Sequence, residues 1–306
     1  MREREFIRHL LATESAPAAS IELGPGDDMA VVRVGHERVL AAIDSVVEGR
    51  HFEAGTAPHL VARKAVLRNL SDVAAMAARP LACLAAVTLP RQADEALARD
   101  LLAGVRSAAE EHRCPLIGGD TTLHAGDGPL TISVAILATP ALRDGRVLTR
   151  RGGRLGDLVA VTGELGNSLR AEGGRRHLDF PPRLEESVAL GEALGSRLHA
   201  MIDVSDGLGV DAGHLVEHDS ALAIELEPAA IPRRDGASLE QALADGEDFE
   251  LLFLCEGPPP PMAVATPVTV IGRVVERGAG ASVRWIGEPA SALDSRGFEH
   301  RSKEGA

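Results

Sequence analysis

Acidic residues recur in this sequence where an apolar run gives way to a turn or a helix. Carboxylates at strand ends can converge on one edge of a sheet, and hard divalent cations such as Mg²⁺ prefer oxygen ligands of this kind. Bound cations could then hold a phosphorylated ligand such as ATP. These acidic positions are Asp27 and Asp28 in GPGDD, Asp44 in AAIDS, Asp72 in NLSDVAAM, Asp120 in LIGGDTT, and Asp203 and Asp206 in MIDVSDGL.

Each of these aspartates also has a purely structural interpretation. Asp72, together with Ser71, could cap the helix that runs through AAMAA. Asp27 could belong to a tight turn, and Asp206 before Gly207 could form an Asx-turn. For any single residue the structural interpretation is favoured. The recurrence of the same context along the chain favours a shared metal site that supports phosphoryl transfer.

The charge balance restricts which partners this protein can have. The chain carries 32 Lys and Arg against 45 Asp and Glu, a net charge of -13. A nucleic-acid-binding protein needs a basic surface, so this class is excluded. The sequence contains neither GxxxxGK[ST] nor the motif set of protein kinases, so ATP would be bound by another fold.

The cysteines and the apolar runs indicate a protein of the cytoplasm. Cys83, Cys114 and Cys255 are far apart in the sequence, which fits buried free thiols better than disulfides or a zinc site. The N-terminal segment MREREFIRHLLATESAP lacks the apolar core of a signal peptide. No apolar run is long enough to span a bilayer, so no membrane partner is expected.

The elements that must position the aspartates alternate between strands and helices, which predicts an α/β protein. With 306 residues the chain is long enough for two domains, and we place them at residues 1–139 and 140–306. The first is expected to contain strands at 38–44, 81–89 and 130–138 and helices at 58–77 and 92–112. The second is expected to contain strands at 157–162, 221–226, 249–254 and 268–275 and a helix at 184–198.

A set of motifs gives a more specific interpretation. GPGDDMAVV, IDSVVEGRHF, NLSDVAAMAARP, IGGDTT, LTRRGGRLGD, VTGELGNS, MIDVSDGL and DGEDFELLF occur in this order. Their order and spelling resemble thiamine-monophosphate kinases, a family of the aminoimidazole ribonucleotide synthetase-like superfamily. The resemblance extends from Gly24 to about His300.

The resemblance implies a two-domain α/β (α+β) fold whose N-terminal domain sheet pairs across a homodimer. It further implies ATP and several Mg²⁺ ions in a cleft, and direct transfer of a phosphoryl group from ATP to thiamine monophosphate, giving thiamine diphosphate. The implied metal ligands are Asp28, Asp44, Asp72, Asp120, Asp203 and Asp206, of which Asp72, Asp120 and Asp206 are expected to serve catalysis. The implied nucleotide contacts are Gly119, Asp120, Arg150 and Ser205, and the substrate contacts are His51, Glu247 and Ser295.

Departures from the family pattern concern the phosphoryl acceptor. Ile43 and Ser295 stand where the family usually has a hydroxyl residue and an aromatic residue, and only 2% of the chain is aromatic. A thiamine ring would gain from an aromatic wall, which Phe298 or Trp285 could supply. Two alternatives therefore stay open: a related ATP-dependent enzyme for another small phosphorylated metabolite, and a non-catalytic protein that binds Mg-nucleotide.

Overall fold

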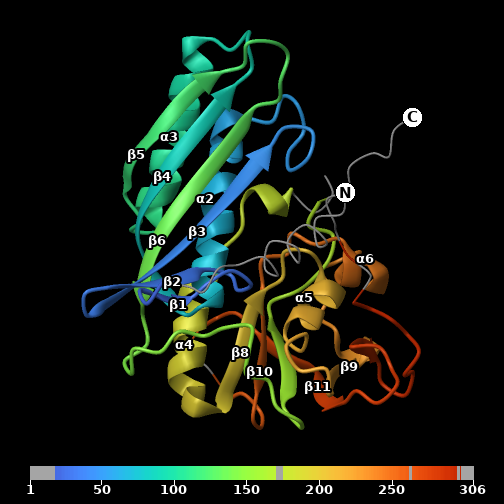
Figure 1. Cartoon of the computed structure of the whole chain (residues 1–306). Coiled ribbons are helices and arrows are strands. Elements are labelled where there is room, and N and C mark those ends of the chain that lie inside the picture. Colours follow the sequence, from blue (N-terminus) through green and yellow to red (C-terminus); the bar gives the residue numbers. More distant parts are fainter. Residues whose placement is uncertain (1–17, 170–174, 262–263, 295–296, 298–306) are drawn as a thin grey trace.

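The computed structural model describes residues 18–169, 175–261, 264–294 and 297. These residues form two six-stranded sheets, one above the other in Figure 1. The chain leaves the first sheet after its last strand and then builds the second. The prediction of a mixed α/β fold is confirmed. No helix among the described residues has the length and apolarity needed to cross a membrane.

The first sheet has the strand order β1-β2-β3-β6-β4-β5. Neighbouring strands are antiparallel except β4 and β5, which are parallel. The strands are β1 (Ile21–Leu23), β2 (Ala30–Val34), β3 (Glu37–Val47), β4 (Ala78–Leu89), β5 (Leu116–Leu123) and β6 (Thr131–Pro140). Two helices, α2 (Pro58–Ala75) and α3 (Glu95–Glu111), lie behind this sheet in Figure 1.

The burial pattern explains why the helices cover one face of this sheet only. Buried and half-buried residues alternate along β6, so that Ile132, Val134 and Ile136 point to the helices. Helix α3 buries Leu101, Val105, Ala108 and Ala109, a spacing that places one apolar stripe toward the sheet. The other face has no covering element among the described residues, and we call it the open face.

The second sheet has the order β12-β9-β11-β7-β10-β8. Its strands are β7 (Leu158–Thr162), β8 (Leu198–Asp203), β9 (Leu222–Leu226), β10 (Leu251–Cys255), β11 (Val268–Glu276) and β12 (Val283–Trp285). Its α-helices are α4 (Leu184–Leu194), α5 (Leu208–His214) and α6 (Leu239–Ala244). Three short 3₁₀ turns are η1 (Arg176–Leu178), η2 (Gly195–Arg197) and η3 (Pro228–Ala230).

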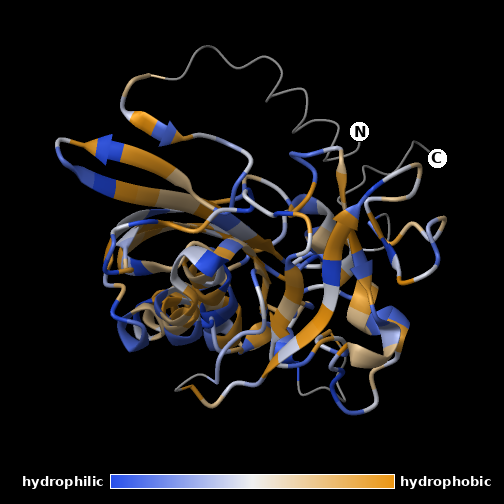
Figure 2. Cartoon of the chain, turned by 90° about the horizontal axis from the view of Figure 1, so that it is seen from below, coloured by the Kyte–Doolittle hydropathy of each residue, from blue (hydrophilic) through white to orange (hydrophobic). Residues whose placement is uncertain are grey.

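Helices cover both faces of the second sheet. Val161 faces the apolar cluster that contains α5 and α6, whereas Ala160 and Phe253 face α4. Strands buried on both sides have continuous apolar sequences, which is why β10 is LLFLC. Figure 2 shows the strands mostly in hydrophobic colours and the connecting loops mostly in hydrophilic ones.

Helix α2 connects the two halves of the molecule. It packs on β3, β4 and β6 of the first sheet and on β8 and α4 of the second. Lys64, Arg68 and Asp72 are spaced four residues apart and therefore lie along one side of the helix. A helix buried from two directions thus carries a polar stripe, which we call the α2 stripe.

Several sequence-based expectations about the elements need correction. Ser71 and Asp72 lie in the last turns of α2 and do not cap the start of a helix. The helix predicted to reach residue 198 ends at Leu194. The strand predicted to begin at residue 81 begins at Ala78 and passes through Pro80, where an irregularity in the pairing with β6 accommodates the proline.

Candidate functional site

Three of the predicted aspartates meet between the two sheets. Asp28 lies in the loop before β2, Asp72 on α2, and Asp203 at the end of β8. One carboxylate oxygen of each lies within 4.8 Å of the others. We call these residues the carboxylate cluster. They are distant in sequence, and the packing of α2 against β8 brings them together.

Specific hydrogen bonds orient the carboxylate cluster. Arg150 donates from Nη2 to Asp28 Oδ1 at 2.6 Å and from Nε to the same oxygen at 3.2 Å. Ser71 donates its hydroxyl to Asp203 Oδ2 at 2.5 Å. The second oxygen of Asp28 is buried and has no hydrogen-bond partner. A buried carboxylate oxygen without a partner is costly, and a cation would satisfy it.

The electrostatics of the carboxylate cluster also favour a cation. Burial raises the pKa of Asp203 to about 7, and the charge of Asp28 contributes to the rise. Burial raises the pKa of Asp72 well above its ordinary value, with further contributions from Asp44, Asp203 and Asp28. Close carboxylates resist ionisation unless a positive charge is added. The all-oxygen donor set suits Mg²⁺.

Asp44 lies at the border of the carboxylate cluster. It faces the helices from β3, where Arg68 Nε donates to its Oδ2 at 3.2 Å. Its charge acts on both Asp72 and Asp203. Arg68 also donates from Nη1 to the carbonyl of Ser45 at 3.5 Å. The sequence motifs did not single out Arg68, because its contacts with Asp44 and Ser45 arise only from the packing of α2 against β3.

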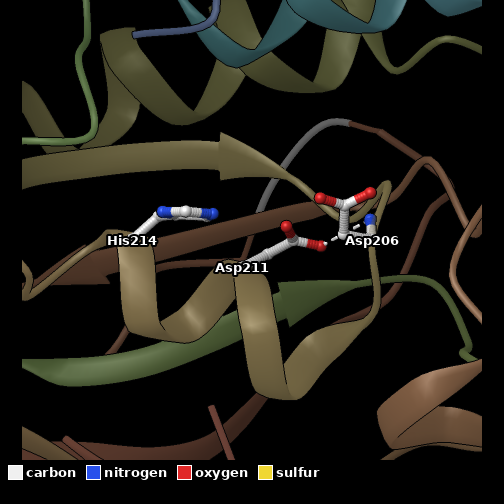
Figure 3. Close-up of side chains that lie close together, drawn as sticks. All are labelled: Asp206, Asp211 and His214. Atoms are coloured by element: carbon white, nitrogen blue, oxygen red, sulfur yellow. Dashed lines mark hydrogen bonds between the residues drawn. The ribbon is translucent and has the colours of Figure 1, made fainter. Parts of the chain in front are cut away.

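Asp206 belongs to a second acidic group beside the first. A ligand atom from each of Asp206, Asp211 and His214 lies within 4.8 Å of the others. Figure 3 shows the three side chains close together at the start and along α5. Asp211 Oδ2 accepts backbone N–H bonds from Ser205 at 3.0 Å and from Asp206 and Gly207 at 3.1 Å. Asp211 therefore fixes the loop that presents Ser205 and Asp206, a role that the sequence had not suggested.

His51 and Glu247, the predicted substrate contacts, are joined by a buried lysine. Lys64 has a fully buried side chain and donates to the His51 carbonyl and to Glu247 Oε2, both at 2.6 Å. Burial lowers the pKa of Lys64 to about 8, although Glu247 partly opposes the shift. The Val47 N–H donates to His51 Nδ1 at 3.0 Å, so a neutral His51 carries its proton on Nε2.

Two adjoining cavities open beside these residues. The larger, the cleft cavity, has a volume of about 250 Å³ and is lined by residues that include His51, Phe52, Arg175, His177 and Glu247. The smaller, the inner cavity, has about 70 Å³ and is lined by residues that include Arg68, Ser205, Asp206 and Phe249. Arg50, His51, Leu169 and Glu247 line both. The cavities therefore connect the predicted substrate contacts to the acidic groups.

The aromatic side chains that line the cavities are not the ones that the sequence predicted. Phe52 lines the cleft cavity, and Phe249 of the inner cavity stacks on Phe180 with ring centroids 3.9 Å apart. Trp285 lies on β12, at the opposite edge of the second sheet from β8, and packs on the core there. Trp285 therefore lines neither cavity, which corrects that expectation. Ser295 and Phe298 lie outside the described residues.

Asp120 lies apart from the carboxylate cluster. It is in register with Ala86, which pairs with Ser133, which pairs with Ser45. Residues paired in this way share a face, and Asp44, the neighbour of Ser45 in sequence, points to the opposite face. Asp120 is therefore exposed on the open face, while the carboxylate cluster lies on the helix side of the same sheet.

A third cavity adjoins Asp120 at the edge of the first sheet. This edge cavity, about 690 Å³, lies between α3 and β5 and is lined by residues that include Arg99, Leu102, Arg106, Gly119 and Asp120. A side chain at position 119 would place its Cβ only 1.9 Å from the Ala85 carbonyl oxygen, so the close pairing of β4 with β5 requires glycine there. The second glycine of IGGDTT is therefore required by the strand pairing itself.

Comparisons with known proteins agree with the resemblance seen in the sequence. Residues 26–139 match the family described as AIR synthase related protein, N-terminal domain. Thiamine-monophosphate kinase from Haemophilus influenzae is 32% identical over 336 aligned positions, which cover 98% of this chain and 98% of that protein. Thiamine-monophosphate kinase from Escherichia coli K12 is 34% identical over 316 positions, 92% of each chain.

Solved structures give the same result for the fold. The structure named AaThiL complexed with AMPPCP and TMP superposes with a TM-score of 0.79 at 27% identity, and the match covers 97% of this chain and 96% of that one. Hydrogenase maturation protein HypE in complex with ATP shares the fold at 18% identity with a TM-score of 0.62. With thiamine-monophosphate kinases matching nearly its whole length at more than 30% identity, the chain belongs to the thiamine-monophosphate kinase family.

Proposed function

We propose that this chain is an ATP-dependent kinase that transfers the γ-phosphoryl group of ATP directly to the phosphate of thiamine monophosphate, forming thiamine diphosphate. The observation that carries the proposal is the carboxylate cluster beside two adjoining cavities that the predicted substrate contacts line. The related AaThiL structure is named as a complex with AMPPCP and TMP, which agrees with a site for two phosphorylated ligands.

The donor side of the reaction is assigned to the acidic residues and to Arg150. Asp28, Asp72 and Asp203 would hold Mg²⁺, with Asp44 and Asp206 as further ligands at the two borders. The orphaned oxygen of Asp28 and the raised pKa values of Asp72 and Asp203 support this assignment. When bound, Mg²⁺ would neutralise charge on the transferring phosphoryl group.

The acceptor side is assigned to the two cavities. The cleft cavity is the larger and contains Phe52, so it suits the thiamine rings. The inner cavity is the smaller and is lined mostly by charged and polar residues, so it suits the phosphate. Lys64 fixes His51 and Glu247 at the boundary of the two cavities. Ser205, the predicted nucleotide contact, and Asp206, the predicted metal ligand, line the inner cavity from a loop that Asp211 holds in place. Ser295 stays a predicted acceptor contact.

We further propose that the protein is a homodimer whose open faces meet. Ile43, Ala135 and Leu84 form a row across the open face, and the Ile43 and Leu84 side chains are exposed although apolar. An exposed apolar face of a sheet indicates a contact surface. Asp120 shares this face. It could therefore serve as the predicted metal ligand and nucleotide contact only in the site of the second subunit. Gly119 beside it would adjoin the nucleotide.

An acceptor comparison tests the proposed function. Purified protein is incubated with Mg-ATP and either thiamine monophosphate, thiamine, or another small phosphorylated metabolite, and the products are separated by chromatography. We expect thiamine diphosphate from thiamine monophosphate and no phosphorylated product from thiamine. Phosphorylation of a different metabolite alone would point to a related enzyme, and ATP binding without any product would point to a non-catalytic protein.

A further inference from the structure

Arg68 is the residue of the α2 stripe to which the proposed function assigns no role. It lies between Lys64, which holds the substrate contacts, and Asp72 of the carboxylate cluster. Its side chain is 17% exposed, and its guanidinium lies near the charges of Asp44, Glu247, Asp72 and Asp203. Arg68 therefore stands where the acceptor region meets the acidic groups.

The hydrogen bonds of Arg68 leave part of its guanidinium available. Nε is committed to Asp44 and Nη1 to the Ser45 carbonyl, the latter at a long 3.5 Å. Its Nη2 makes no hydrogen bond with any residue in the described part of the chain. Arg68 also lines the inner cavity, so these remaining N–H groups have a small enclosed space next to them.

The inner cavity has the size and chemistry of a phosphate site. Its volume of about 70 Å³ is less than a third of the 250 Å³ of the cleft cavity, with which it shares four lining residues. A phosphate dianion entering it would meet the carboxylates of Asp206, Asp245 and Glu247. A cation on the wall is needed to offset that repulsion, and arginine binds phosphate through paired N–H groups.

Resting on the proposed function, we infer that Arg68 binds the phosphate of the acceptor in the inner cavity. The same guanidinium donates to Asp44 through Nε. One side chain would therefore position the acceptor phosphate next to a proposed metal ligand. Arg50 lines both cavities as well, but it stands on an exposed turn, whereas Arg68 is fixed on a helix packed from both sides. Arg68 is thus assigned as a substrate-binding residue for the phosphate itself.

The test compares the affinities for thiamine monophosphate and thiamine, which differ only in the phosphate. Dissociation constants are measured by calorimetry for the wild type, Arg68→Met, Arg68→Lys and Arg63→Met. Arg63 lies on the same helix and bonds Asp179 and Glu111 outside both cavities, so its variant is the matched control. We expect Arg68→Met to weaken thiamine monophosphate binding by about 10- to 100-fold and thiamine binding by less than about twofold.

Arg68→Lys keeps the charge without the paired N–H groups, so we expect an intermediate loss. Arg63→Met should bind both ligands like the wild type, and the KM for ATP should stay within about twofold in every variant. Equal loss of both ligands in the two Arg68 variants, or a change confined to Mg²⁺ dependence, would overturn the assignment and leave Arg68 as a structural cation. Wild-type protein that prefers thiamine monophosphate over thiamine yet forms no thiamine diphosphate would instead overturn the proposed function alone.

Discussion

At the scale of single residues, the site is a set of carboxylates that the fold forces together. Asp28, Asp72 and Asp203 lie within 4.8 Å of one another, and the pKa of Asp203 is raised to about 7. Such proximity is unfavourable for the free protein, since each buried charge opposes the next. The arrangement becomes favourable when a divalent cation is bound, so a cost in stability serves the proposed activity.

The first prediction concerns Asp72. We expect Asp72→Asn to lower kcat by a factor of about 10²–10³ or more, because one proposed metal ligand is lost from the site of phosphoryl transfer. The melting temperature in chelator should rise, since the variant removes repulsion with Asp44 and Asp203. Steady-state kinetics and thermal unfolding check both parts. Undiminished activity would contradict a metal-ligand role.

The second prediction concerns pH and metal removal. The pKa of Asp203 is about 7 in the folded protein against 3.8 for the ordinary group. The folded state therefore holds this proton longer than the unfolded state, and stability decreases as pH rises from about 4 to 7. In chelator, the free energy of unfolding of the wild type should fall over this range, and the fall should be smaller in Asp203→Asn. Added Mg²⁺ should restore stability near pH 7; equal pH profiles for the two proteins would contradict this account.

At the scale of secondary structure, α2 organises the site. It carries Lys64, Arg68 and Asp72 on one side and packs on elements of both sheets. Because Lys64 has a fully buried side chain and binds the His51 carbonyl and Glu247, the helix ties a turn after β3 to the loop before β10. A shift of α2 would therefore disturb the acceptor contacts and the proposed metal ligands together.

The third prediction concerns Lys64. We expect Lys64→Met to raise the KM for thiamine monophosphate by about tenfold or more, with little change for ATP, because two acceptor contacts lose their shared anchor. In the wild type this KM should also rise as pH increases through about 8, since Lys64 then loses its proton. Kinetics from pH 6.5 to 9.5 measure both effects. A variant with the same pH-dependent rise as the wild type would speak against Lys64 as its source.

Part of the site and of the fold could be predicted from the sequence, and part could not. Asp28, Asp72 and Asp203 were predictable because each follows or interrupts an apolar run, and because several such sites recur. Lys64 and Arg68 were not, since charged residues on a helix ordinarily face solvent and only packing from both sheets buries these. The edge strand β5 was missed because LIGGDTT contains two glycines, which weaken a strand assignment when its partner strand is unknown.

At the scale of the whole molecule, the two faces of the first sheet separate residues that the sequence grouped together. Asp120 lies on the open face, and the carboxylate cluster lies on the helix side. Their convergence was predicted because the aspartates share one local context and because the family resemblance implied six of them as metal ligands. Local context does not tell which face of a sheet a residue occupies. The division into domains 1–139 and 140–306 and the homodimer remain predictions.

The fourth prediction tests the shared site. Asp72→Asn and Asp120→Asn should each be inactive, but an equimolar mixture exchanged under mild denaturation should recover about a quarter of wild-type activity. Half of the randomly formed dimers would then be mixed, and each mixed dimer would contain one intact site. Size-exclusion chromatography with light scattering checks that the species is a dimer. No recovery in a demonstrably mixed dimer would place Asp120 in the site of its own subunit.

The most direct measurement of the central claim follows the γ-phosphate of ATP. Protein, Mg²⁺, thiamine monophosphate and ATP labelled in the γ-phosphate are mixed, and ADP, inorganic phosphate and thiamine diphosphate are quantified with their label. We predict one labelled thiamine diphosphate for each ADP, none without Mg²⁺, and none from Asp72→Asn. Release of the label as inorganic phosphate without thiamine diphosphate, or equal labelled product from Asp72→Asn, would contradict direct transfer at the carboxylate cluster.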